Sequence, residues 1–492
     1  MCENPNILSK EYWNSRYIRV VDEIKHKIKK IKGIITAFNT NIDAVHFLKE
    51  GEIEEIINEL NIGEEVIQNL KNPPFKVNMP AEFLTGLINC IQTGRGAEWP
   101  IYRKNVSSWI RSSFSIDELR MGGQAGIMAN VLAKLGVSKV YPHVAQMSEM
   151  QARLFSSNGE ILIANLEGDS VKFQKPINSV RLKDEPLIHW IFEFKKGLKV
   201  RIDNILIEAP ESNRFITAWD EYNSRLEINP TFKEASLKVI NEIDKVMISG
   251  YNQLRKSYVN GSSFNQYIER TVELISKWKS SNHKIKIHYE QAFLQDEEII
   301  KAIFEKVFPY VDGVGLNEDE LSFVLDAYGF HRIAEKIRST YSVPVLYGGA
   351  KVIFEKFNIS RVVIHARDFA FSFLRPTYGI SPKTQQNALI FGAAVAANRA
   401  LTGKFGDLRE VQITLMNSSL SLSEIGLAQQ RSIIKMLRSE GIASLNKFME
   451  DGIFENQEWA FIYVPTKVTD HPVSTVGLGD CFTAGLLIGE TE

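Results

Sequence analysis

The second half of the chain alternates short apolar strands with helical patterns, and this alternation constrains the fold more than any other feature. The apolar runs begin after residue 237 and continue to the C-terminal end. Strands that are joined by helices imply right-handed crossovers and a parallel sheet with both faces covered. The sequence therefore predicts an α/β protein with a mostly parallel central sheet and helices on both faces. The predicted strands are residues 246–249, 284–290, 311–316, 343–347, 362–364 and 460–464.

Two segments in the first half have a different pattern. Residues 48–115 are helical with mixed charge, and residues 155–235 contain short alternating strands between charged turns. We expect residues 48–115 and 155–236 to form a small β-rich α/β lid. The large domain would then comprise residues 1–47, 116–154 and 237–492. A chain of 492 residues is longer than one usual hydrophobic core, which fits this division.

Charge and cysteine content exclude several classes of protein. The chain has 58 Lys and Arg against 59 Asp and Glu, so no bulk charge attracts nucleic acid or an anionic membrane. Its three cysteines are far apart and fit neither a disulfide framework nor a zinc site. We found no signal-peptide pattern and no apolar run long enough to cross a bilayer. We expect a cytoplasmic protein, a monomer or small homo-oligomer, with small-molecule ligands.

The stretch Gly477-Leu478-Gly479-Asp480 is the strongest candidate for a site. Its glycines allow a tight turn with converging backbone N–H groups, and the apolar run that follows predicts a helix from about Asp480. Such a helix start stabilises the charge of a transferring phosphoryl group, and a carboxylate there can take a proton from an attacking hydroxyl. Asp480 is therefore a candidate catalytic base. A plain strand-to-helix turn with Asp480 as N-cap would look the same.

Two further carboxylates follow neighbouring predicted strands. Glu290 ends one strand, and Glu320 comes directly after the next. Adjacent parallel strands lie about 5 Å apart, so their carboxyl ends can bring both groups to one crevice. Carboxylates so placed suit Mg²⁺, which binds phosphate oxygens alongside one or two carboxylates. Taken singly, each is also an ordinary strand end or acidic helix start.

Other polar positions are open to two interpretations. Asn41 and Asp43 follow the predicted strand 34–38, where open α/β sheets bind ligands, but a polar loop has the same pattern. Gly122 and Gly123 would allow either close approach to a ligand or close helix packing. No P-loop, dinucleotide fingerprint, HExxH, GxSxG or paired CxxC motif is present.

Together these motifs resemble the archaeal ADP-dependent sugar kinases of the ribokinase superfamily. The resemblance rests on the Gly-Leu-Gly-Asp helix start, the HYE strand end, the NEDE turn, NTNID, MGGQAGIMAN, HWIFEF and NRFI, and it spans nearly the whole chain. It implies a ribokinase-like large domain. It also implies a glycolytic kinase that phosphorylates glucose or fructose 6-phosphate with ADP and releases AMP. Methanogen members of this family can use both sugars.

The resemblance also implies roles for individual residues. Asp480 would be the base, with Gly477 and Gly479 in the anion hole. Magnesium would be held, largely through water, by Glu290 and Glu320, supported by Asn317 and His288. Sugar hydroxyls would be bound by Asn41, Asp43, Gly122, Gly123, Gln124 and His189. The ADP phosphates would contact Arg214, and the adenine would lie near His365 and Val468.

The choice of sugar depends on three further residues. In the family, a Glu at the position assigned to Glu82 accompanies glucose use, although alone it is an ordinary first-turn Glu. Lys172 and Arg201 are the candidates for binding a phosphate at C6, although lone lid cations are usually solvated. Their presence together predicts a bifunctional phosphofructokinase/glucokinase. The alternatives are an ATP-dependent ribokinase-type sugar or nucleoside kinase, and a non-catalytic sugar-binding protein.

Overall fold

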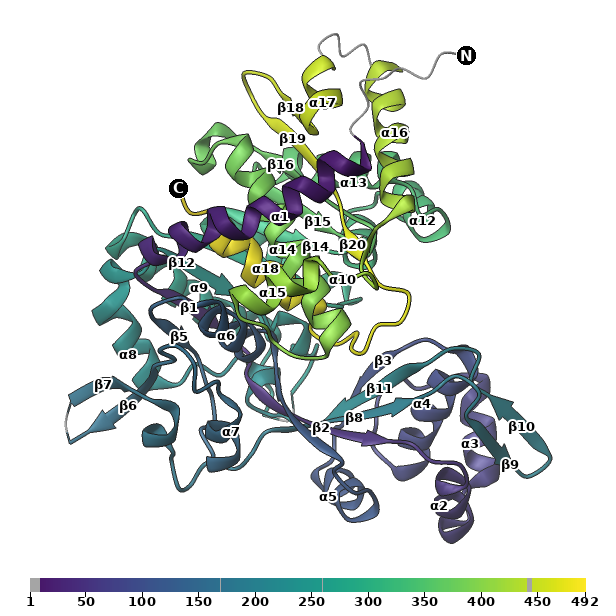
Figure 1. The fold of residues 1–492 in the computed structure, drawn as a ribbon. Helices are drawn as coiled ribbons and strands as arrows, with labels where there is room; N and C mark the ends of the chain where they lie inside the picture. Colours follow the sequence, from purple (N-terminus) through teal and green to yellow (C-terminus); the bar gives the residue numbers. More distant parts are fainter. Residues whose placement is uncertain (1–8, 169, 259, 440–444) are drawn as a thin grey trace, which may run out of the picture.

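The computed structural model describes residues 9–168, 170–258, 260–439 and 445–492. Within these ranges, the larger sheet has nine strands in the order β18-β19-β16-β15-β14-β13-β12-β1-β5 (Figure 1). The strands from β5 to β15 run parallel to their neighbours, whereas β16, β19 and β18 are antiparallel. The mostly parallel sheet is therefore confirmed. Its strands are β1 (Ile34–Ala37), β5 (Val140–Pro142), β12 (Lys245–Ile248), β13 (Lys286–Glu290), β14 (Gly313–Leu316), β15 (Arg361–His365), β16 (Phe369–Leu374), β18 (Ile453–Glu455) and β19 (Ala460–Pro465).

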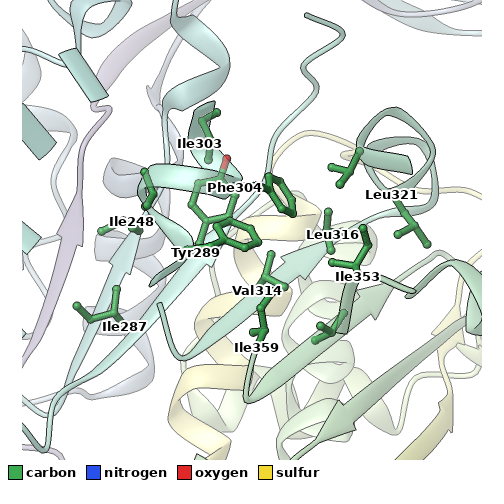
Figure 2. Close-up of a cluster of buried hydrophobic side chains, with 14 of the residues drawn as sticks. Ile248, Ile287, Tyr289, Ile303, Phe304, Val314, Leu316, Leu321, Ile353 and Ile359 are labelled. Carbon is green, nitrogen blue, oxygen red and sulfur yellow. The ribbon is translucent and has the colours of Figure 1, made fainter. Parts of the chain in front are cut away.

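Helices cover both faces of this sheet, so both faces are buried. Successive side chains of a strand point to opposite sides, so each strand contributes to two apolar clusters. In β12, Val246 and Ile248 pack into one apolar cluster and Met247 into the other. Figure 2 shows part of the first cluster, where Tyr289 and Val314 from neighbouring strands meet helix side chains. Helices contributing to the first cluster are α8 (Pro230–Val239), α9 (Phe264–Ser281), α10 (Glu297–Lys306), α11 (Glu318–Ala327), α12 (His331–Ser339), α13 (Val343–Lys356), α16 (Glu424–Ser439) and α17 (Asn446–Asp451). Those contributing to the second are α1 (Lys10–Lys27), α6 (Gln124–Leu135), α7 (Glu149–Leu154), α14 (Pro382–Thr402), α15 (Leu408–Leu415) and α18 (Leu478–Gly489).

One predicted strand, residues 343–347, is wrong. These residues begin helix α13, whereas the other predicted strands correspond to β12, β13, β14, β15 and β19. A short buried apolar run fits either a strand or a helix. Pro344 lies in the first turn of α13, where the missing N–H costs nothing. No helix in the described ranges has the length and apolar character needed to cross a membrane.

The smaller sheet lies at one end of the molecule, with the order β3-β11-β8-β2-β4 (Figure 1). Aromatic and aliphatic side chains from this sheet and from the helices before it form a separate core. Its strands are β2 (Asn41–Phe47), β3 (Ala97–Pro100), β4 (Glu118–Gly122), β8 (Ile188–Phe194) and β11 (Asn213–Ala218). The helices are α2 (Glu52–Leu60), α3 (Gly63–Lys71), α4 (Pro80–Thr93) and α5 (Lys104–Ser113), next to the hairpin β9 (Lys199–Ile202) and β10 (Ile205–Glu208).

Three segments depart from the predicted division into domains, and one of them is β4, which belongs to the smaller sheet although residues 116–154 were predicted for the large domain. Residues 41–47 follow β1 after a three-residue link, and as β2 they pair with β8 and β4 of the smaller sheet. The hairpin of β6 (Ile163–Glu167) and β7 (Ser170–Gln174) instead packs on the large core, where Phe173 contacts the ring of Tyr141 at 4.6 Å between centroids. The apolar contacts of the hairpin, rather than its short alternating strands, determine which core it packs on. The remaining domain limits stay a prediction. A short antiparallel pair is formed by β17 (Ser421–Leu422) and β20 (Lys467–Val468), and β20 lines the second cavity described below.

Helix α18 packs closely on α14. A Cβ built on Gly485 of α18 would lie 2.9 Å from the Cα of Gly392 and 3.1 Å from the backbone oxygen of Phe391. Residues 480–489 are all buried. The two glycines let the helix backbones approach, which fixes the N-terminal end of α18 at the carboxyl edge of the large sheet.

We expect Gly485→Ala to lower the free energy of unfolding by about 1–3 kcal/mol, because the added methyl forces the helices apart. Chemical and thermal denaturation would measure the change. Gly348→Ala is the matched control: Gly348 lies within α13, and a Cβ there meets nothing within 4 Å. The control should unfold at the same denaturant concentration and temperature as the wild type, or at slightly higher values. Equal midpoints for all three proteins would contradict the close packing.

Candidate active site

A cavity of about 320 Å³ lies between the two sheets, at the carboxyl edge of the larger one. We call it the first cavity. Residues from β13, α11 and α18 form one side, and residues from β2, β8 and β11 form the other. The carboxyl edge of an open α/β sheet is where such folds bind ligands.

Most of the predicted site residues line the first cavity. Gly122 lies beside them in β4, where a Cβ would overlap the side chains of Asn41 and Asp43. Its lack of a side chain therefore makes room for these two residues. The predicted residues that line the cavity are Asn41, Asp43, Gly123, Gln124, His189, Arg214, Glu290, Asn317, Glu320, His365, Gly477, Gly479 and Asp480.

The three residues predicted to choose the sugar do not line the first cavity. Glu82 turns back to its own helix start and accepts a hydrogen bond from the Asn78 backbone N–H. Lys172, in β7, forms an ion pair with Glu167 at 2.6 Å between Nζ and Oε2. Arg201 is exposed in β9, on the hairpin with β10. Helix and hairpin geometry directs these side chains elsewhere, which sequence position alone did not reveal.

The N-terminus of α18 opens into the cavity. Gly477 is its N-cap with φ of 73°, a backbone conformation that favours glycine. The helix begins at Leu478, two residues before the predicted start, so Asp480 lies within its first turn. The first N–H groups of a helix have no partners within the helix, which leaves them available to an anion.

Asp480 is a buried carboxyl group. Burial raises the pKa of Asp480 to about 7, and the nearby charge of Glu290 acts in the same direction. A carboxyl group with a pKa near neutrality is suited to exchange protons with a bound ligand.

Glu290 has the opposite electrostatics. Its Oε1 interacts with His365 Nε2 at 2.9 Å, and its Oε2 accepts hydrogen bonds from His288 Nε2 at 2.8 Å and Thr483 Oγ1 at 2.9 Å. Burial alone would raise the pKa of Glu290, but the charge of His365 and the hydrogen bonds from His288 and His365 lower it to about 2. The charge of Glu290 in turn raises the pKa of His365 to about 9, against the effect of burial. Glu290 is therefore ionised.

Glu320 and Asn317 form a capping box at the start of α11. The Asn317 N–H donates to Glu320 Oε2 at 2.8 Å, and the Glu320 N–H donates to Asn317 Oδ1 at 2.9 Å. Burial raises the pKa of Glu320 to about 8. An arriving cation would favour the ionised form.

These carboxylates fit a magnesium ion held through water. The described residues include no cluster of three or more His, Cys, Asp or Glu arranged to hold a metal directly. The oxygen donors of Glu290, Glu320 and Asp480 nevertheless line one cavity. Mg²⁺ prefers oxygen ligands and keeps several waters, so this donor set suits it.

The opposite wall carries amide, acidic and basic hydrogen-bonding groups. Asn41 Nδ2 donates to Asp43 Oδ1 at 2.8 Å, and burial raises the pKa of Asp43 to about 6. His189 Nε2 interacts with Asp220 Oδ2 at 2.8 Å. Burial opposes the charge of His189, but the hydrogen bond and charge of Asp220 raise its pKa overall. Asp220 therefore orients His189 toward the cavity.

Glu98 and Asn252 are among the residues of this wall that were not predicted from the sequence. Glu98 lines the cavity from β3 and accepts a hydrogen bond from Gln253 Nε2 at 2.8 Å. Asn252 also lines it, and its buried Oδ1 has no hydrogen-bond partner among the described residues. No local motif marks either residue, because strand pairing in the smaller sheet and the turn after β12 bring them to the cavity.

A second cavity of about 570 Å³ adjoins the first. It shares Asn317, His365, Thr475, Leu478 and Gly479 with the first cavity, so the two meet at the start of α18. Its other walls are largely apolar and include the following residues: Ala393, Ala396, Ala397, Val468 and Phe482.

Arg214 reaches the same junction from β11. Its Nη1 donates to Thr475 Oγ1 at 3.3 Å, and its buried Nε has no hydrogen-bond partner among the described residues. A guanidinium group with a free donor beside a helix N-terminus suits an anionic ligand.

Comparisons with known proteins show which proteins this chain resembles. Residues 32–489 match the ADP-specific Phosphofructokinase/Glucokinase conserved region. The chain is 28% identical to the ADP-specific phosphofructokinase of Methanosarcina acetivorans, covering 97% of each chain. It is 30% identical to the ADP-dependent glucose/glucosamine kinase of Pyrococcus furiosus, covering 97% of this chain and 98% of that one. A solved ADP-dependent kinase in complex with fructose-6-phosphate and ADPbetaS is similar in structure, with a TM-score of 0.84, 28% identity, and coverage of 98% of this chain and 99% of the other.

The raised pKa of Asp480 predicts a pH-dependent effect on stability. The folded state binds this proton more tightly than the unfolded chain, so the protein loses stability as pH rises from the unfolded pKa of 3.8 through about 7. Asp480→Asn cannot ionise. We compare the free energy of unfolding of Asp480→Asn with that of the wild type in metal-free buffer. We expect the difference, variant minus wild type, to be about 1–3 kcal/mol more positive at pH 8 than at pH 5. Chemical denaturation at both pH values tests this, with the exposed Asp470→Asn as control. A pH-independent difference would contradict it.

Proposed function

The chain belongs to the ADP-specific phosphofructokinase/glucokinase family, and from this membership we propose that it transfers the terminal phosphoryl group of ADP to a hydroxyl group of a hexose, releasing AMP. The proposed acceptors are glucose and fructose 6-phosphate. One observation carries the proposal: Asp480 and the start of α18 lie where a polar cavity meets an apolar one. A sugar in the first and a nucleotide in the second would face each other across Asp480.

Asp480 would act as the base that takes the proton from the attacking sugar hydroxyl. Its pKa of about 7 lies near a working pH, which suits a general base. The backbone N–H groups after Gly477 would stabilise the charge that develops on the transferring group. Phosphoryl transfer depends mainly on such positioning and electrostatics.

The nucleotide would occupy the second cavity. Its apolar walls, including Val468, suit a flat adenine ring, and His365 lies at the junction with the first cavity. Arg214 would contact the phosphate oxygens with its free Nε and bring the smaller sheet onto the nucleotide. The smaller sheet would thus serve as a lid that excludes water.

Glu290 and Glu320 would hold Mg²⁺ through water, with Asn317 fixing Glu320. A bound divalent cation would neutralise charge on the phosphoryl oxygens. His288 is not in the cavity lining, and it supports the site by donating to Glu290.

Glucose is the better match to the first cavity. The sugar would bind to Asn41, Asp43, Gly123, Gln124 and His189, together with Asn252 and Glu98. A neutral hydroxyl can donate to Glu98, whereas a phosphate would be repelled by it. Lys172 and Arg201, the predicted phosphate ligands, lie away from this lining. We therefore propose that glucose is used more efficiently than fructose 6-phosphate.

Asp480→Asn should fold, bind glucose and lose about 10²–10⁴-fold in kcat, because a base of this kind contributes that much. A coupled assay with Mg²⁺ would compare ADP and ATP as donors. Glucose binding by calorimetry serves as the control for folding. Near-normal kcat would remove Asp480 as the base, turnover with ATP alone would refute the donor, and no turnover by the wild type with any pair would favour a binding protein.

Glu98→Gln should raise the KM for glucose about tenfold, because a charged hydrogen bond to the sugar is weakened. The matched control is Glu82→Gln, which removes a carboxylate that does not line the cavity. Its KM values should stay within about twofold of the wild type. The opposite ranking of the two variants would restore Glu82 as the residue that recognises glucose.

A further inference from the structure

A chain of buried polar side chains runs beneath the first cavity, from the end of α18 to Glu290. Glu490 follows the last residue of α18 and forms an ion pair with Arg361 at the start of β15. Arg361 contacts His288 in β13, and His288 contacts Glu290. The side chains of Arg361 and Glu490 are 0% and 1% exposed.

The surroundings of Arg361 fix its guanidinium group. Glu490 compensates its charge, which a buried ion requires. The ring of Tyr378 lies 4.9 Å from the guanidinium carbon, and the hydroxyl of Tyr378 donates to Glu490 Oε2 at 2.8 Å. Arg361 is thus held by an anion and an aromatic face at once.

The contacts of His288 with Arg361 and with the ionised Glu290 require the same tautomer of the imidazole. A guanidinium group has only donors, so His288 Nδ1, which faces Arg361 Nη2, must accept. The ring proton is then on Nε2, which donates to Glu290 Oε2 at 2.8 Å. The same oxygen accepts from Thr483, so its two lone pairs are used. Oε1 is the oxygen with capacity left for a further ligand.

Strand β14 provides the space for this chain of side chains. Gly313 and Gly315 are two residues apart and therefore face the same side of the sheet. A Cβ on Gly313 would lie 2.6 Å from Arg361 Nε, and one on Gly315 would lie 3.2 Å from His288 Cε1 and overlap Glu290. The two glycines are therefore required by the side chains of the neighbouring strands.

We propose that Arg361, held by Glu490, is a positioning residue that fixes His288 as its Nε2–H tautomer and thereby orients the Glu290 carboxylate in the site. Its importance for turnover rests on the proposed function, in which Glu290 holds a divalent cation. Its effect on His288 does not depend on that function. Partners of this kind, one step removed from a metal site, commonly change metal affinity or activity by about 10–100-fold when they are removed.

The first test is the tautomer of His288 in the metal-free protein. Nitrogen-15 labelling of the nine histidines, with His288→Gln to assign the signal, reports which ring nitrogen carries the proton. The wild type should show Nε2–H alone, and Arg361→Gln should lose this single state. An Nδ1–H tautomer in the wild type, or an unchanged His288 signal in Arg361→Gln, would overturn the proposal. Finding Nδ1–H in the wild type would overturn the proposal even if the variant fails to fold.

The second test is the response to Mg²⁺. Arg361→Gln should raise the Mg²⁺ concentration for half-maximal turnover about tenfold, with the KM for glucose within about twofold. Arg375→Gln is the matched control, because this partly buried arginine of the same sheet end donates to the carbonyls of Ile359 and Phe354 instead. Equal shifts in both variants would reduce Arg361 to a general structural role. A wild type without sugar kinase activity would refute the proposed function, while the tautomer would still decide the role of Arg361.

Discussion

The close packing of α18 against α14 is the constraint on which the rest of the site depends. Gly485 and Gly392 bring the two helix backbones together, so α18 has little freedom to slide or tilt. Three functions are thereby fixed on one rigid element: Asp480 at its start, Thr483 one turn later, and the ion pair of Glu490 after its end. Loops could carry the same groups, but they would not fix the distances between them as one rigid helix does.

Burial separates the protonation states of neighbouring carboxyl groups. The charge of His365 and the hydrogen bonds from His288 and His365 keep Glu290 ionised, whereas burial raises the pKa of Asp480 and Glu320. In water these groups would behave alike. In the cavity one is a permanent anion and two respond to an arriving cation or ligand, which is the division of labour that a proton-accepting transfer reaction requires. As a consequence, the folded state loses stability at high pH, where the buried carboxyl groups with raised pKa values must ionise.

The sequence predicted the features that are local and missed those that depend on packing. Asp480, Glu290 and Glu320 were found because each is next to a strand end or helix start, whose place in an α/β sheet is known in advance. Glu98 and Asn252 were missed because no neighbouring residue marks them and only the paired strands bring them to the cavity. The apolar run at Val343 was taken for a strand because a buried helix has the same composition over so short a length. Lys172 was predicted to lie in the lid because residues 155–235 contain short alternating strands, whereas Phe173 beside it packs on Tyr141 of the large core.

The link between β1 and β2 has a consequence for how the molecule senses its ligand. Only residues 38–40 separate a strand of the large sheet from one of the smaller sheet, and Asn39 and Asn41 line the first cavity. The return crossing, from β4 into α6, passes through Gly123, which lines the same cavity. Two of the links between the large core and the smaller sheet are therefore also walls of the first cavity. Under the proposed function, a sugar in the first cavity would contact both links directly, so ligand binding and the angle between the two sheets would be coupled without a separate transmitting element.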